Sequence, residues 1–214
     1  EQCFVIDPLA IDDFSAFKKV LTDHAIVKVL HSCSEDLEVF DHLFKVVPQP
    51  IMDTQIAAAF DGYGFSLGYR QLTETLLQIH LDKGETRSNW LQRPLTSSQL
   101  HYAALDVTYL PEIYHLLKNS LHQKGRYLWL QEECELMLNA FEKTKISDQY
   151  YRKITSGWKL NAKDLGVLQR LVQWRELTAR DKNIPRGWVL KDRNCYDIAR
   201  LQPEYPRDLA AIEG

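Results

Sequence analysis

Apolar residues along the chain form short β-branched runs and, between them, longer stretches with helical spacing. The run at 25–30, AIVKVL, is typical of a buried parallel strand. Residues 3–6 and 50–52 are predicted to be two further short strands. Apolar residues at three- and four-residue steps predict helices over 11–21, from Ser32 or Ser34 to about 44, and over 53–60, 72–81, 96–110, 111–125 and 128–141. Strands followed by helices predict an α/β layer architecture.

The pattern changes after residue 142. The segment 143–160 is polar and irregular, so we predict a linker between a domain at 1–142 and a small all-helical domain at 161–214. The last helix of the chain is expected around 196–201 and is closed by Pro203. In the helix that starts at Ala162, we expect five side chains to face inward: Leu165, Leu168, Leu171, Val172 and Trp174. We expect a set of basic side chains to surround them: Arg170, Arg175, Arg180 and Lys182.

Length and composition narrow the class of protein. The chain has 214 residues, of which 45% are hydrophobic, enough for a full domain and a smaller one. Its apolar runs are far shorter than a membrane span, so we expect no membrane contact. We also expect no signal peptide, because Glu1 and Gln2 lead directly into a strand-like segment. The four scattered cysteines include no CxxC pair, which favours reduced thiols in a cytoplasmic protein.

The net charge of −3 conceals two regions of opposite sign. Residues 1–150 hold 13 basic and 21 acidic side chains, whereas residues 151–214 hold 13 basic and 8 acidic ones. An acidic body with a basic C-terminal region fits a metal-carboxylate catalytic domain joined to a module that binds nucleic acid. The charge alone is explained equally well by a mildly basic helical domain that does not bind nucleic acid.

The stretch 88–110 carries the clearest candidate chemistry. Thr96 followed by Gln99 is a capping-box pattern that predicts a helix start. Tyr102 and Asp106 lie four residues apart and therefore share a face of that helix. A carboxylate can hold a divalent cation, and a phenol one turn away can hydrogen-bond a water on that cation. The alternative is a surface tyrosine and an ordinary helical aspartate, since this pair is common by chance.

A second candidate follows the strand at 25–30. Asp36 is in the first turn of the next helix, beyond the carboxyl end of the strand, where parallel sheets place their sites. An aspartate there also complements the helix dipole without any further role. His31 is expected to be a structural residue at the strand end. Asp53 is expected to open the helix at 53–60.

Both candidates match a known family. The stretch 88–110 resembles the third exonuclease motif of the ribonuclease D family, in the branch whose motif carries a tyrosine. The residues that carry this resemblance are at 90, 93–95, 99, 102–104, 106–107 and 109–110. His31, Asp36 and Leu37 resemble the second motif of the same family. The run Asp53-Thr54-Gln55 is not the first motif, Asp-Thr-Glu, because it follows the second motif and has glutamine in place of the carboxylate. Residues 161–214 resemble the helicase-and-RNase-D C-terminal (HRDC) domain, a small helical nucleic-acid-binding module.

The resemblance implies a ribonuclease H-like α/β fold and a DEDD-type 3′–5′ exoribonuclease. Such an enzyme trims RNA 3′ ends, such as those of tRNA precursors, and releases 5′-nucleotides by hydrolysis with two Mg²⁺ or Mn²⁺ ions between four acidic ligands. It implies Asp36 and Asp106 as two of the metal ligands and as catalytic residues, together with Tyr102, which would orient or help deprotonate the attacking water. The sequence identifies no protein partner.

The chain departs from this family pattern at its first motif. Its only Asp-x-Glu is at 36–38, within the second motif, so we expect the first two strands to be missing and the 214 residues alone to be inactive. The HRDC-like domain is also expected to be incomplete, ending before its last helix. Three hypotheses remain: an incompletely supplied ribonuclease D, which we favour, a non-catalytic RNA-binding relative, and a helical protein without a nucleic-acid role.

Overall fold

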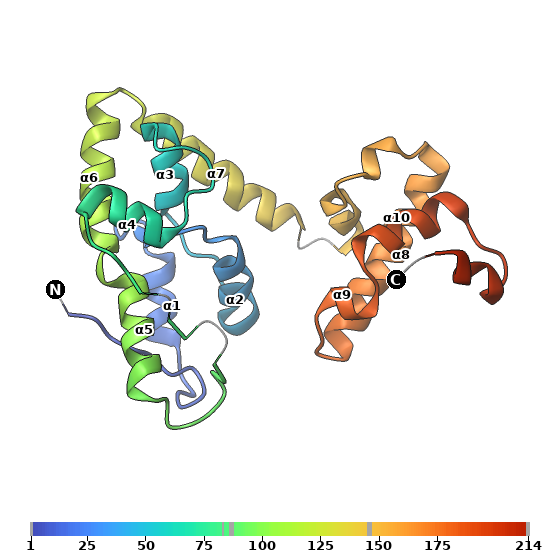
Figure 1. The fold of residues 1–214 in the computed structure, drawn as a ribbon, viewed down its shortest axis with the longest axis horizontal. Helices are drawn as coiled ribbons and strands as arrows, with labels where there is room; N and C mark the ends of the chain where they lie inside the picture. The colour runs from blue at the N-terminus through green and yellow to red at the C-terminus, as the bar shows by residue number, and fades with distance from the viewer. Residues whose placement is uncertain (1, 83, 86–87, 145–146, 213–214) are drawn as a thin grey trace. The chain divides into compact units, whose positions relative to one another are not determined.

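The computed structural model describes residues 2–82, 84–85, 88–144 and 147–212, and the chain divides into two compact units, Glu1–Leu138 and Asn139–Gly214 (Figure 1). Elements of the first unit follow in the order α1 (Ser15–Thr22), β1 (Lys28–Leu30), α2 (Ser34–Phe44), β2 (Ile51–Asp53), α3 (Thr54–Asp61), α4 (Tyr69–Leu77), α5 (Ser97–Thr108), α6 (Leu110–Gln123) and the larger part of α7 (Tyr127–Thr144), whose last residues belong to the second unit.

A short parallel sheet lies among these helices. β1 pairs with β2 in the register Lys28↔Ile51, Val29↔Met52 and Leu30↔Asp53. Helix α6 packs against both β1 and α3. The fully buried side chains of this unit come mostly from its helices and include Leu37, Leu72, Ile113, Leu117, Leu121 and Leu130. The expected strand-then-helix order and α/β layering are therefore confirmed in this unit.

Local signals in the sequence set several helix ends. Asp53 opens α3 as expected, since its carboxylate accepts hydrogen bonds from the backbone N–H groups of the first turn. Gly62 ends α3 with φ +103°, a conformation that favours glycine. The predicted capping box of Thr96 and Gln99 is present at α5. Pro111 lies in the first turn of α6, so a new helix starts close to the boundary expected between the helices at 96–110 and 111–125.

Other local predictions were wrong. Residues 3–6 form no strand, and the side chain of Phe4 is 75% exposed. A strand needs a hydrogen-bonding neighbour, and in the described part of the chain the sheet consists of β1 and β2. The first helix starts at Ser15 rather than at 11, because the carboxylate of Asp13 accepts hydrogen bonds from both the N–H and the hydroxyl of Ser15. Helix α4 spans 69–77 rather than 72–81 and starts from the extended backbone of Gly68.

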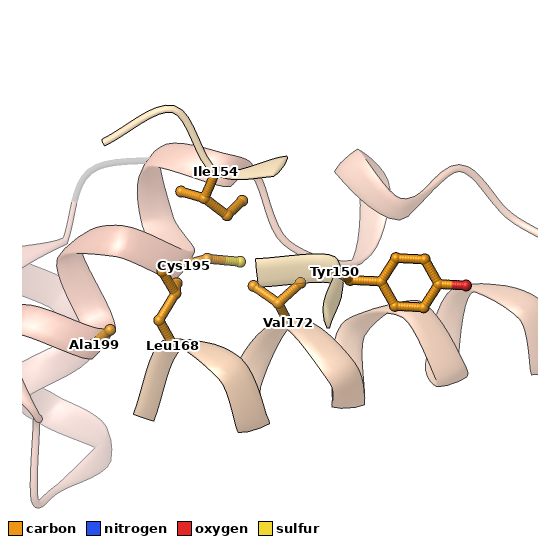
Figure 2. Close-up of a cluster of buried hydrophobic side chains, with 6 residues drawn as sticks. All are labelled: Tyr150, Ile154, Leu168, Val172, Cys195 and Ala199. Carbon is orange, nitrogen blue, oxygen red and sulfur yellow. The ribbon is translucent and has the colours of Figure 1, made fainter. Parts of the chain in front are cut away.

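The second unit is helical. It contains the 3₁₀ helices η1 (Ser147–Lys153), η2 (Gly157–Lys159) and η3 (Pro206–Ala211), and the α-helices α8 (Ala162–Asp181), α9 (Arg186–Val189) and α10 (Asp192–Leu201). Helix α8 packs against η1, α9 and α10. Figure 2 shows a buried cluster formed by η1 and the residue Ile154 after it, α8 and α10; it consists of Tyr150, Ile154, Leu168, Val172, Cys195 and Ala199.

Three expectations for this region need correction. Within the predicted linker at 143–160, Tyr150 and Ile154 are buried in this cluster, because apolar side chains on η1 and just after it pack against α8. Trp174, expected to face inward, is 52% exposed. Arg175, expected on the surrounding basic surface, is 3% exposed and pairs with Asp192 at 2.6 Å. A buried arginine is retained where carboxylates neutralise it. The boundaries 1–142 and 161–214 stay predictions.

The longest helices, α7 and α8, both carry several charged side chains. Among the residues that the structure describes, no helix has the length and apolar character that a membrane span requires. The cytoplasmic location and the lack of membrane contact stay predictions.

Candidate active site

The start of α5 is tied to the segment that precedes it. The buried side chain of Gln99 accepts a hydrogen bond from the Thr96 N–H and donates to Oγ of Ser88 and to the carbonyl of Asn89. Oγ of Ser98 donates to the carboxylate of Glu85 at 2.6 Å. These contacts hold Glu85, Ser88 and Asn89 against the helix that carries Tyr102 and Asp106.

Tyr102 and Asp106 line one open cavity of about 660 Å³. The first turn of α4 forms much of its wall, together with α5 and the segment around 81–82; the lining residues are Gly68, Tyr69, Arg70, Gln71, Glu74, Leu81, Asp82, Tyr102, Leu105 and Asp106. The hydroxyl of Tyr69 joins the two helices, since it donates to the carbonyl of Leu105 and accepts from the N–H of Tyr109, each at 3.2 Å. The predicted pair therefore faces a space that a ligand can enter.

The ring of Tyr102 is held on two sides. A Cβ atom at Gly84 would lie 2.0 Å from Cδ2 of this ring, so the glycine backbone approaches the ring more closely than any other residue could. The ring of Trp90 lies on another side, with 6.0 Å between the ring centroids, and its Nε1 donates to the Glu85 carbonyl. Burial and the nearby Asp106 carboxylate raise the pKa of Tyr102, and the positive charge of Arg70 opposes this rise.

Asp106 is also influenced by its surroundings in the cavity. Partial burial raises the pKa of its carboxyl group, while the charge of Arg70 and the nearby Tyr102 hydroxyl act in the opposite direction. All three side chains line the same cavity, and Arg70 is close enough to affect the pKa of both Tyr102 and Asp106. This is an arrangement in which a carboxylate and a phenol can act on one water or one phosphate.

Asp36 lies in the first turn of α2, as predicted, but its described neighbours differ from those of Asp106. Partial burial and the carboxylates of Asp53 and Glu35 raise the pKa of Asp36. In the described ranges, no three or more His, Cys, Asp and Glu side chains gather in a way that could hold a metal ion. The meeting of Asp36 and Asp106 at one metal site therefore stays a prediction.

Asp53 has the structural role expected for it. Its side chain is 2% exposed and accepts hydrogen bonds from the N–H groups of Ser32, Cys33, Gln55 and Ile56. The carboxylate therefore joins the end of β1 to the start of α3.

His31 links the same region to the cavity wall. Nδ1 of His31 lies 2.9 Å from Oγ1 of Thr54, and its ring contacts the ring of Tyr69 edge-on, with centroids 5.6 Å apart. Burial lowers the pKa of His31 and favours its neutral form. The expected structural role fits these contacts.

Two residues of this site were not found from the sequence. Arg70 follows a glycine-rich loop, and no local motif sets it apart; only its position in the cavity does. Gly84 lies in a short irregular segment, and its role depends on a ring 18 positions later in the chain. Neither relation produces a periodic or spaced pattern that sequence reasoning can detect.

Comparison with known proteins identifies the family of this domain. A family model described as 3′-5′ exonuclease matches residues 1–122. The chain belongs to this exonuclease family. A second family model, the HRDC domain, matches residues 164–214. The predicted resemblance to ribonuclease D and the predicted fold class, an α/β exonuclease domain followed by an HRDC-type domain, are confirmed.

Individual relatives support the same assignment. A curated protein named Ribonuclease D from Pseudomonas paraeruginosa is 45% identical over 210 residues, which are 98% of this chain and 56% of that protein. The crystal structure of Escherichia coli RNase D, described as an exoribonuclease involved in structured RNA processing, matches with a TM-score of 0.80 at 38% identity and covers 96% of this chain and 55% of that one. Brucella melitensis NrnC with bound Mg²⁺ matches with a TM-score of 0.54 at 29% identity, over 59% and 61% of the two chains. The chain thus spans about half the length of the curated relatives it matches.

Proposed function

We propose that this chain is part of a 3′–5′ exoribonuclease of the ribonuclease D type, which removes 5′-nucleotides from RNA 3′ ends, such as those of tRNA precursors. The observation that carries the proposal is the position of Tyr102 and Asp106, which share one helix face and line an open cavity in a domain of the exonuclease family. A surface tyrosine and an ordinary helical aspartate would not need a cavity or the ring support of Gly84 and Trp90.

Within this proposal, Asp36 and Asp106 hold divalent metal, Mg²⁺ or Mn²⁺, with two ions in the working enzyme. Carboxylate oxygens suit these hard cations, and the ions supply charge neutralisation and an activated water. The hydroxyl of Tyr102 would orient the attacking water through a hydrogen bond or help deprotonate it. Since two carboxylates from this chain are fewer than two ions require, further acidic ligands must complete the site.

The HRDC-type unit is proposed to bind the RNA backbone. Residues 151–214 have five more basic than acidic side chains, and three tryptophans of this region are highly exposed: Trp158, Trp174 and Trp188. Lys159 lies over the ring of Trp158, so cationic and aromatic surfaces occur together there. Phosphates attract the cations and bases stack on the rings. We therefore expect binding that falls as salt rises and depends little on base sequence.

The test follows release of mononucleotides from a 3′-labelled single-stranded RNA with Mg²⁺ or Mn²⁺. We expect the product of the complete reading frame to release labelled 5′-nucleotides and to stop when a chelator is added. The 214-residue chain alone should release very little, because its only Asp-x-Glu lies within the second motif. Robust release by the 214-residue chain would show that other residues complete the site, and failure of the complete protein would refute the proposed activity.

A non-catalytic RNA-binding role is the second candidate. It is favoured by the lack of a three-ligand metal cluster among the described residues. A shift assay separates the candidates, since a complete protein that binds RNA without cleaving it would support this role. If neither binding nor cleavage is seen, the helical protein without a nucleic-acid role is the remaining hypothesis.

A further inference from the structure

Arg70 is the feature of the cavity that the proposed chemistry does not use. Three carboxylates line this cavity, from Glu74, Asp82 and Asp106, whereas Arg70 is the only cation among the described lining residues. Anionic RNA would be repelled by such a wall unless a cation or metal offsets it. The position of Arg70 therefore matters for any substrate that enters.

The guanidinium of Arg70 is available in a way that those of Arg93 and Arg126, the other described arginines of this unit, are not. Arg93 pairs with Asp7 at 2.6 Å, and Arg126 donates to the carbonyl of Phe60 at 2.9 Å. Within the described part of the chain, Arg70 has no such ion pair or side-chain hydrogen bond, although it is half-buried at the wall of the cavity. Its five N–H donors thus remain for a ligand.

Arg70 lines the same cavity as the candidate catalytic pair, Tyr102 and Asp106. Its charge also acts on both of these side chains. A free planar guanidinium binds phosphate oxygens through two parallel hydrogen bonds, which fixes the orientation of the phosphate as well as its position. A ligand phosphate held by Arg70 would therefore lie beside Tyr102 and Asp106.

We propose that Arg70 is a substrate-positioning residue, which binds a backbone phosphate of single-stranded RNA in this cavity and orients the 3′ end against Tyr102 and Asp106. This inference rests on the proposed function. It assigns Arg70 a direct contact with RNA, in contrast to a role limited to balancing the charge of Asp106.

The test compares Arg70→Gln and Arg70→Lys with a control of equal charge change, Lys19→Gln. Lys19 is exposed on α1 and does not line the cavity. The KM and kcat of the complete protein are measured on a short single-stranded RNA with Mg²⁺. In parallel, fluorescence anisotropy follows binding of the same RNA to the 214-residue chain over a range of salt, with a chelator present.

We expect Arg70→Gln to raise KM about tenfold with a smaller change in kcat, because a phosphate contact is made in both ground and transition states. The slope of log affinity against log salt should shrink by about 0.7, the value for one phosphate contact on a single strand. Compared with Arg70→Gln, Arg70→Lys should recover the full salt slope but only part of the RNA affinity. Lysine keeps the positive charge but lacks the planar guanidinium that donates two parallel hydrogen bonds to a phosphate. Lys19→Gln should match the unmodified protein.

Two failures are distinguishable. If the complete protein cleaves RNA but Arg70→Gln and Lys19→Gln have the same KM and the same salt slope, Arg70 makes no phosphate contact and the inference is wrong. If Arg70→Gln lowers kcat alone, Arg70 acts only on the charge of the catalytic pair, which also overturns the inference. If no metal-dependent cleavage occurs, the proposed function fails, and the slopes still report whether Arg70 touches RNA. If the 214-residue chain binds no RNA but the complete protein cleaves it, the proposed function stands and the KM of Arg70→Gln in the complete protein decides the inference.

Discussion

The close approach of Gly84 to Tyr102 leads to a sharp prediction for Gly84→Ala. The new Cβ would lie 2.0 Å from Cδ2, 2.6 Å from Cε2 and 3.0 Å from Cγ of the tyrosine ring. Carbon atoms pack best at about 3.5–4.0 Å, so the ring or the backbone must move by about 1.5 Å. The neighbouring Glu85 is tied to α5 through Ser98 and accepts from Trp90, so we expect the ring to move.

The displaced ring should lower catalysis much more than RNA binding. A misplacement of about 1 Å in a catalytic group can reduce rate about 10²-fold. We therefore expect Gly84→Ala to lower the single-turnover rate of the complete protein about 10²-fold, with KM little changed. In a Tyr102→Phe background the same substitution should have almost no further effect, because the group it displaces is already missing.

Gly166→Ala is the matched control for this experiment. Gly166 lies inside α8, and a Cβ there would meet nothing within 4 Å. We expect unchanged activity and a gain in stability of about 0.5–1 kcal/mol, because alanine loses less backbone entropy in a helix. A single-turnover rate of Gly84→Ala within about twofold of the rate of the unmodified protein would refute this prediction. It would mean either that the backbone at Gly84 moves in place of the Tyr102 ring or that catalysis does not depend on the position of this ring.

Three further predictions concern single residues. Tyr102→Phe should lower turnover at saturating RNA by about 10² to 10⁴-fold and leave RNA affinity unchanged, because the hydroxyl acts in the chemical step; rapid-quench kinetics and a binding titration check this. Asp53→Asn should lower the free energy of unfolding in urea by about 1.5–3 kcal/mol, because an amide cannot replace a carboxylate that accepts four N–H bonds, whereas Asp12→Asn on the surface should have no effect. His31 should make stability pH-dependent: its pKa is lowered from 6.5 by burial, so the unfolded chain binds a proton first and the free energy of unfolding should fall as pH drops below about 6.5. His31→Asn should flatten this slope, and an unchanged slope would assign the pH dependence to other groups.

The start of α5 and the residues that share its polar face could be predicted from the sequence because the determinants of both are local. The capping box fixes where the helix starts, and the four-residue spacing then places Tyr102 and Asp106 on one face. The same holds for Asp53 as a helix cap and for the restart at Pro111, since each depends on backbone groups within a few residues. Family motifs in the same stretch carried the assignment from a helix face to an exonuclease.

Tertiary structure alone decided which side chains meet across the chain. Arg70 and Tyr102 share a cavity, and Gly84 touches the tyrosine ring, because the start of α4 and the segment before α5 pack against the same helix. In the second unit, Arg175 is buried by its pairing with Asp192 on α10, while Trp174 beside it remains exposed. Helical periodicity shows which residues share a face of a helix. Whether those residues are buried or form ion pairs depends on the elements that pack against that face, and these elements are distant in the sequence.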